Sequence, residues 1–239
     1  MRASPVALAV TVLVAVGCGS ASKPPPRHAA TAFRIESCVK PGPTTRVVDV
    51  AALHGPIVTI GSGSTAVVMA NQDGGNLCEW LPLARGLARA GIRAAVFDYV
   101  GAASDDDVVA VARDLRRTGA RRVALVGAST GGRVVLHAAA TRPTEADAVI
   151  TLSAERTGRS GYPTLSDARH LHTRALYVGT TEDGYTTFAA ETRQLYRATR
   201  ASGKQLLLLS GSEHGTDILA GGQAARVIAA ITRFVQNAG

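Results

Sequence analysis

A serine lies between two glycines where a buried strand is expected to pass into a helix. Residues 127–131 read Gly-Ala-Ser-Thr-Gly, a G-x-S-x-G pattern centred on Ser129, and the apolar run 123–126 precedes it. A sharp strand-to-helix turn strains its central residue, and only glycine-sized neighbours leave room for it. The turn presents the hydroxyl beside the positive end of the helix dipole. The pattern predicts a nucleophilic serine. The alternative is a tight turn or a phosphate-binding loop, although a Walker lysine is missing.

A serine hydroxyl needs a base that takes its proton and a third group that orients the base. His214 is the best base in the sequence, because it follows the expected strand 205–209 directly. The acid is expected where the preceding strand ends, with Asp183 as the first candidate and Glu182 as the reserve. The resulting order Ser129, Asp183, His214 is one of the known chain orders of a Ser–His–Asp triad.

Short apolar runs alternate with longer amphipathic runs along most of the chain. We expect strands at residues 46–50, 57–60, 65–70, 94–99, 123–126, 148–152, 175–178 and 205–209. We expect helices at residues 77–90, 105–118, 187–200 and 218–235, and another that begins at Thr130. Repeated strand–helix units joined by short loops predict an α/β fold, with a mostly parallel sheet and helices on both faces. The three candidate side chains then lie at the carboxyl ends of strands.

The stretch from about residue 61 to residue 234 resembles the bacterial α/β-hydrolase family. In that family the strand after the first hairpin ends in a His-Gln or His-Gly turn, followed by Gly-Gly and a Cys-x-Trp helix. Here residues 71–80 read NQDGGNLCEW. The resemblance implies an α/β-hydrolase fold and an esterase-like serine hydrolase that cleaves ester or thioester bonds through an acyl-enzyme, without a cofactor. It also implies an oxyanion hole formed by the backbone N–H groups of Asp73 and Thr130.

Two positions depart from the family pattern. Asn71 stands where the family usually has histidine, and Asp73 places a carboxylate beside a pocket meant for an anion. An ionised Asp73 side chain that pointed inward would oppose the oxyanion. These departures favour an alternative, a catalytically weak hydrolase-fold binding module. The same triad also supports a peptidase or an acyltransferase that acts on an envelope component.

The segment between Ser153 and Arg174 is where larger family members insert a helical cap. Its 20 residues allow a short helix and a loop, which is a minimal cap and not a full lid. An open, shallow site suits small or exposed acyl groups better than a deep lipid tunnel. We expect Trp80 to pack in the core under the site rather than to line it.

The composition excludes a disordered chain, because 46% of the 239 residues are hydrophobic and 18% are charged. The formal net charge of +8 at first suggests a nucleic-acid partner. The basic residues, however, are dispersed in ones and twos, and aromatic residues are not interleaved with them. We therefore expect an arginine-rich surface, no nucleic-acid partner, and a small ester or acyl compound as substrate.

The first residues indicate an export signal. Arg2 precedes the apolar run 6–16, which is too short to span a bilayer as a helix. Residues 15–18 read Ala-Val-Gly-Cys and resemble a bacterial lipobox, which implies cleavage after residue 17 and lipidation of Cys18. An ordinary secretory signal is the alternative.

This interpretation divides the chain into three parts. Residues 1–17 form a lipoprotein-type signal peptide, residues 18–32 the lipidated cysteine with a flexible Ser/Pro/Ala-rich linker, and residues 33–239 the hydrolase domain. The predicted location is the extracytoplasmic face of the cell membrane, held by the lipid anchor. With an ordinary signal the protein is secreted.

Two cysteines remain in the exported chain, and they are candidates for pairing. A bridge between Cys38 and Cys78 would tie the N-terminal extension to the helix that begins near Asn76. Two separately buried thiols are the alternative. We expect no metal site, since no Cys-x-x-Cys motif occurs and the pair His170 and His172 lies in a polar loop without acidic neighbours.

Overall fold

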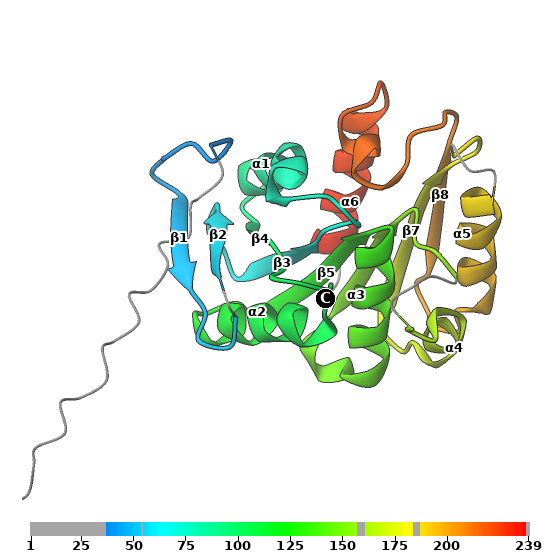
Figure 1. Ribbon diagram of the computed structural model, residues 1–239, viewed down its shortest axis with the longest axis horizontal. Helices are drawn as coiled ribbons and strands as arrows, with labels where there is room; N and C mark the ends of the chain where they lie inside the picture. Colours follow the sequence, from blue (N-terminus) through cyan, green and yellow to red (C-terminus); the bar gives the residue numbers. More distant parts are fainter. Residues whose placement is uncertain (1–36, 54, 157–160, 184–186, 238–239) are drawn as a thin grey trace, which may run out of the picture. The chain divides into compact units, whose positions relative to one another are not determined.

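The computed structural model of the protein describes residues 37–53, 55–156, 161–183 and 187–237. Within these residues eight strands form one sheet in the order β1-β2-β4-β3-β5-β6-β7-β8 (Figure 1). The pairs β1–β2 and β2–β4 are antiparallel, and the other pairs are parallel. The strands are β1 Thr45–Asp49, β2 Pro56–Ile60, β3 Thr65–Ala70, β4 Arg93–Phe97, β5 Arg122–Ala128, β6 Ala148–Leu152, β7 Arg174–Thr180 and β8 Gln205–Leu209.

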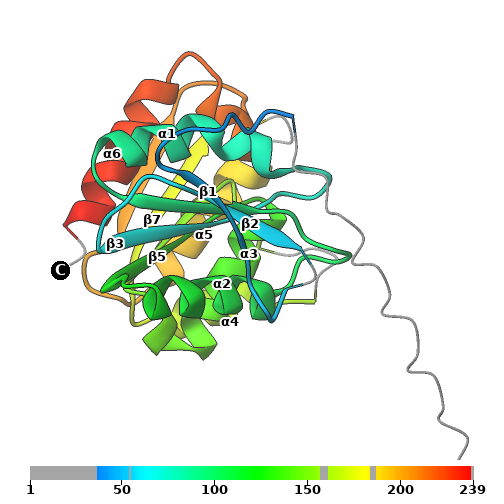
Figure 2. The same ribbon diagram turned by 90° about the vertical axis from the view of Figure 1, so that its left-hand side faces the viewer.

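Helices cover both faces of the sheet, as the sequence predicts (Figures 1 and 2). The helices are α1 Leu81–Arg89, α2 Asp105–Arg117, α3 Thr130–Thr141, α4 Thr164–His170, α5 Thr187–Ala198 and α6 Ala224–Gln236, with short 3₁₀ turns η1 Leu77–Trp80, η2 Pro143–Glu145 and η3 Gly215–Leu219. Buried side chains of α1 and α6 form the core on one face, and those of α2 to α5 form the core on the other. The central strands β3 and β5 are continuous apolar runs because both of their faces are buried.

Two expected helices are broken, each for a local reason. The segment 77–90 divides into η1 and α1, because Pro82 lies in the first turn of α1 and cannot donate a backbone hydrogen bond there. The segment 218–235 begins as η3 and resumes as α6 after the Gly221–Gly222 pair. The cap segment holds the short helix α4, as its length allows, and this helix takes up His170, which the sequence placed in a loop.

The predicted cysteine pair is joined. Cys38 and Cys78 form a disulfide with their Cα atoms 5.9 Å apart. The bridge connects the segment before β1 to η1, where the Asn76 side chain accepts a hydrogen bond from the Cys78 N–H at 2.9 Å. It therefore fixes the chain directly after the loop that carries Asp73.

The predicted signal peptide, the lipidated Cys18 and the linker to residue 32 lie outside the described residues. In the part of the chain that the structure describes, no helix has both the length and the apolar character needed to cross a membrane. The lipid anchor stays a prediction from the sequence.

Candidate active site

Ser129 lies in the sharp turn between β5 and α3. Its backbone has φ 48° and ψ −115°, a conformation that residues other than glycine rarely adopt. A Cβ atom at Gly127 would collide with the carbonyl of Gly131, and one at Gly131 would collide with the carbonyl of Ala70. The two glycines of the G-x-S-x-G pattern are therefore required by close backbone approach, as expected of a nucleophile turn.

The structure brings the predicted base and acid together. Nδ1 of His214 lies 2.9 Å from Oδ1 and 3.1 Å from Oδ2 of Asp183, whose side chain is 1% exposed. The ring of Phe188 packs against the His214 ring, with 4.4 Å between centroids. Glu182, the reserve acid, is exposed, and its backbone N–H donates to the carbonyl of Gly211 at 2.8 Å. With Nδ1 held by the carboxylate, Nε2 is the nitrogen of His214 that can accept a proton.

Ser129 is hydrogen-bonded elsewhere. Its Oγ donates to Oε1 of Glu155 at 3.0 Å, and within the described residues no hydrogen bond joins Ser129 to His214. Glu155 follows the end of β6, the strand that pairs with β5 on the side away from β3. Sequence reasoning missed Glu155. The signal that could have found it is a carboxylate three residues past the end of an expected strand.

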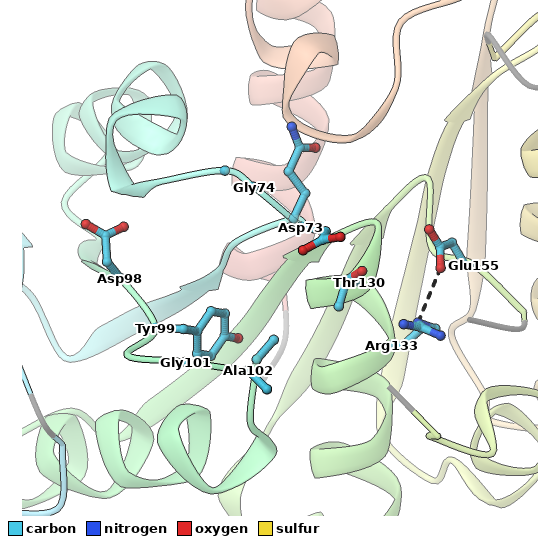
Figure 3. A pocket seen from close by; sticks show the side chains of 12 residues that line it. Asp73, Gly74, Asp98, Tyr99, Gly101, Ala102, Thr130, Arg133 and Glu155 are labelled. Atoms are coloured by element: carbon cyan, nitrogen blue, oxygen red, sulfur yellow. Dashed lines mark ion pairs between the residues drawn. The ribbon is translucent and has the colours of Figure 1, made fainter. Parts of the chain in front are cut away.

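A cavity of about 900 Å³ is lined by Thr130, the residue after Ser129, and by Glu155, the hydrogen-bond partner of Ser129 (Figure 3). Among the described residues, Ser129 and His214 themselves do not line it. Its lining includes Asp73, Tyr99, Thr130, Arg133 and Glu155. Burial raises the pKa of the Tyr99 hydroxyl well above its ordinary value of 10, and nearby carboxylates, Asp107 before Asp105, raise it further. Tyr99 is therefore a neutral wall of the cavity at physiological pH.

The two residues expected to supply the oxyanion hole lie side by side at this cavity (Figure 3). The backbone N–H groups of Asp73 and Thr130 have no hydrogen-bond partner among the described residues. The Asp73 side chain is exposed, so solvent screens its carboxylate. The geometry leaves both N–H groups available to a ligand in the cavity.

Asn71 holds the start of the loop that follows β3 and carries Asp73. Its side chain is buried, donates to the Phe97 carbonyl and to Oδ1 of Asp98 at 3.0 Å each, and accepts from Nε1 of Trp80 at 2.8 Å. Oδ1 of Asp98 also accepts the Leu77 N–H at 2.7 Å. Trp80 is fully buried and does not line the cavity, in agreement with the expected core role. The amide thus fills a structural position at the site where the family pattern has histidine.

Hydrogen bonds connect the loops that carry the site residues. Oε1 of Gln72 accepts the Thr216 N–H at 3.0 Å, and Thr216 Oγ1 donates to Oε2 of Glu79 at 2.6 Å. Thr180 Oγ1, at the end of β7, donates to the Glu213 carbonyl at 2.8 Å. These bonds fix the loop after β8, which carries His214, to the segment after β3 that carries Asp73 and to the end of β7, which leads to Asp183. No group of three or more His, Cys, Asp or Glu side chains in the described ranges could hold a metal ion.

No family model and no curated protein matches the sequence. Solved structures do match. A monoacylglycerol lipase from Paleococcus ferrophilus is 15% identical with a TM-score of 0.66, covering 77% of this chain and 98% of its own. An esterase from Pyrococcus furiosus is 12% identical with a TM-score of 0.67, covering 80% and 90%. A dienelactone hydrolase from Anabaena variabilis is 17% identical with a TM-score of 0.65, covering 80% and 95%. The chain has the α/β-hydrolase fold, as the sequence predicts.

Proposed function

We propose that the protein is a serine hydrolase that cleaves small esters, with Ser129 as nucleophile, His214 as base and Asp183 as its orienting acid. The observation that carries the proposal is the buried Asp183 carboxylate on Nδ1 of His214. Both residues follow the carboxyl ends of neighbouring parallel strands, at the same edge of the sheet as the strained Ser129 turn. The proteins of the same fold that are named an esterase and a lipase support the reaction class.

The proposed reaction begins when the Ser129 hydroxyl leaves Glu155 and gives its proton to Nε2 of His214. Oγ then bonds to the ester carbonyl carbon, and the carbonyl electron pair moves to oxygen. The N–H groups of Asp73 and Thr130 stabilise this oxyanion. As the bond to the alcohol breaks, His214 returns the proton to the alcohol oxygen. Water adds to the acyl-enzyme by the same route, which releases the acid and restores Ser129.

Asp183 acts by positioning. Its bond to Nδ1 keeps the proton on that nitrogen, so the Nε2 lone pair faces the reaction, and its charge stabilises the imidazolium that forms. Because the carboxylate is almost completely buried, solvent does not weaken this interaction.

The cavity and the cap support a small substrate. The described cap segment provides one short helix, α4, and a cavity of about 900 Å³ adjoins Ser129 through Thr130 and Glu155. The same triad would cleave a thioester, or act as a peptidase or an acyltransferase on an envelope component. The binding-module alternative is favoured by one observation, the Ser129–Glu155 hydrogen bond, in which the hydroxyl proton is donated to Glu155 and not to His214.

We also propose that the protein is exported and anchored by lipid on Cys18, at the extracytoplasmic face of the membrane. Residues 15–18 support the anchor, and the disulfide between Cys38 and Cys78 supports an oxidising compartment. The Cys18→Ala protein should move from the membrane fraction to the soluble fraction of the producing cells. Unchanged membrane association would rule out this anchor.

The test of the proposed reaction is hydrolysis of 4-nitrophenyl acetate and butyrate by the wild-type and Ser129→Ala proteins. We expect Ser129→Ala to lose roughly 1,000-fold or more in kcat/KM. Ser153→Ala is the matched control, because Ser153 is a second buried serine with positive φ, at the end of the adjacent strand. It should retain activity within about 3-fold. Equal hydrolysis by wild type and Ser129→Ala would exclude Ser129 as nucleophile.

A further inference from the structure

Arg133 is a buried cation, and two of its guanidinium nitrogens form no hydrogen bond with the described residues. The residue is 1% exposed, and its Nε and Nη1 atoms are inaccessible and form no hydrogen bond. Burying a guanidinium is unfavourable unless an acceptor satisfies its N–H groups. A buried polar group that the protein leaves unsatisfied at a cavity calls for an explanation, and a bound ligand that accepts its hydrogen bonds is one.

Arg133 lies next to the nucleophile. It is four residues after Ser129, on the same face of α3, and its backbone N–H donates to the Ser129 carbonyl at 3.3 Å. Its side chain lines the cavity together with Thr130 and Glu155 (Figure 3). Among the described residues that line the cavity, it is the sole cation.

The carboxylates of the cavity do not satisfy this guanidinium. Oε2 of Glu155 forms an ion pair with Nε of Arg133 at 3.6 Å, which is too long for a hydrogen bond, while Oε1 accepts from Ser129 (Figure 3). Asp98 accepts hydrogen bonds from Asn71 and the Leu77 N–H. Asp73 is exposed, so solvent screens its repulsion of a bound anion far more than it screens the buried Arg133.

We propose that Arg133 is the anchor of a carboxylate-binding subsite, so that the esters cleaved at Ser129 carry a free carboxylate near the scissile carbonyl. A guanidinium forms charge-assisted hydrogen bonds with a carboxylate, often two in parallel. The Glu155 carboxylate lies between the two groups: its Oε1 is 3.0 Å from Oγ of Ser129 and its Oε2 is 3.6 Å from Nε of Arg133. A monoester of a short dicarboxylic acid spans such a separation. This inference rests on the proposed ester hydrolysis for its substrate, while the anion-binding site itself can be tested without turnover.

The first arm compares two esters of equal length, ethyl hydrogen glutarate and ethyl pentanoate, by pH-stat titration. We expect wild-type kcat/KM to be roughly 10- to 100-fold higher for the glutarate monoester, the range of one charge-assisted interaction. Arg133→Met should remove this preference and retain hydrolysis of the pentanoate ester. Arg133→Lys, which keeps the charge and loses the planar donors, should retain part of the preference.

Arg156→Met is the matched control. Arg156 immediately follows Glu155, but its side chain is 43% exposed and does not line the cavity. Its Nε atom lies 4.0 Å from Oε1 of Glu191. The control changes the net charge as Arg133→Met does, so it separates the subsite from a general electrostatic effect. It should keep the glutarate preference within about 2-fold. An equal loss of preference in both variants would contradict the assignment of the subsite to Arg133.

The second arm measures binding without turnover, as the thermal stabilisation of the protein by glutarate and by the neutral glutaramide. Glutarate should stabilise the wild-type and Arg156→Met proteins but not Arg133→Met, and glutaramide should stabilise none. If Arg133→Met does not fold, Arg133→Lys and the two wild-type ligand series still decide the question.

The two proposals can fail separately. Stabilisation by glutarate that depends on Arg133, without hydrolysis of any ester, keeps the subsite and rejects the proposed reaction. Hydrolysis without preference for the acidic ester, together with no stabilisation by glutarate, rejects the subsite and keeps the proposed reaction.

Discussion

Oγ of Ser129 donates a hydrogen bond to Oε1 of Glu155 at 3.0 Å, and among the described residues no hydrogen bond joins it to His214, its proposed base. Meanwhile His214 is already held by Asp183. The site therefore consists of two preassembled halves, one with the nucleophile and one with the acid and base. In the proposed reaction, Ser129 must exchange Glu155 for Nε2 of His214 before it attacks.

Removal of the Glu155 carboxylate should favour that exchange. We expect Glu155→Ala to raise kcat for 4-nitrophenyl acetate by about 3- to 10-fold, because a hydrogen bond that holds the resting nucleophile is lost. Glu191→Ala, which removes an acid paired with Arg156 outside the cavity, should leave kcat unchanged. A loss of 10-fold or more in Glu155→Ala alone would instead assign Glu155 a part in the reaction.

The two neighbouring acids after β7 should differ sharply. Asp183→Asn preserves the shape of the side chain but removes the charge that orients His214. We therefore expect kcat to fall by roughly 1,000- to 10,000-fold at about pH 7. Glu182→Gln changes an exposed side chain and should keep kcat within about 2-fold. Similar losses in both variants, measured with 4-nitrophenyl acetate, would refute the assignment of the acid.

Asn71 should stabilise the loop that follows β3 and carries Asp73. Replacement with leucine leaves Nε1 of Trp80 and the Phe97 carbonyl without their buried partner, so we expect a loss of about 2–4 kcal/mol in unfolding free energy. Asn76→Ala, which removes the more exposed cap of η1, should cost about 1 kcal/mol. Urea unfolding measures both. An Asn71→Leu protein as stable as wild type would show that the amide network contributes nothing.

Asp105 should make stability depend on pH. Burial alone would raise the pKa of Asp105, but hydrogen bonds from Arg142 and Tyr162 outweigh burial and lower it below 3.8. A lowered folded-state pKa gives stabilisation that is present above the unfolded-state pKa and lost as pH falls through the folded-state value. Asp105→Asn should therefore cost about 1 kcal/mol at neutral pH, allowing for solvent screening, and less as the pH falls below about 4.

The control for this prediction is Asp106→Asn. Asp106 pairs with the same Arg142 but is 79% exposed, so its loss should have a smaller effect. Urea midpoints measured from about pH 7 down to about pH 3 provide the comparison. A cost of Asp105→Asn that stays constant over this range would contradict the role of the Asp105 charge.

The sequence predicted those features of the site that depend on local backbone geometry and on chain order. The close approaches at Gly127 and Gly131 are visible as a motif, and chain order places Asp183 and His214 at strand ends. The contact between Ser129 and Glu155 is not visible, because it depends on the pairing of β5 with β6 and on the path of the loop beyond β6. No motif marks that loop.

The same limit applies to charge and to element boundaries. The sequence shows Arg133 as one arginine among many, and only the packing of α3 reveals that it is buried at the cavity. Amphipathic periodicity continues through residues 77–90, yet Pro82 divides that segment into two helical pieces. Tertiary packing decides the burial of Arg133, and a single sequence does not encode it as a pattern. The break at Pro82 is local, and the amphipathic period hides it.

Labelling with a fluorophosphonate, followed by mass-spectrometric mapping of the modified peptide, tests the central claim most directly. Such a probe phosphonylates a serine that a neighbouring base activates. We predict stoichiometric modification of wild type at Ser129, none of Ser129→Ala, and strongly slowed modification of His214→Ala. Folded wild-type protein that takes no label, or a label that persists in Ser129→Ala, would contradict the assignment of Ser129 as an activated nucleophile.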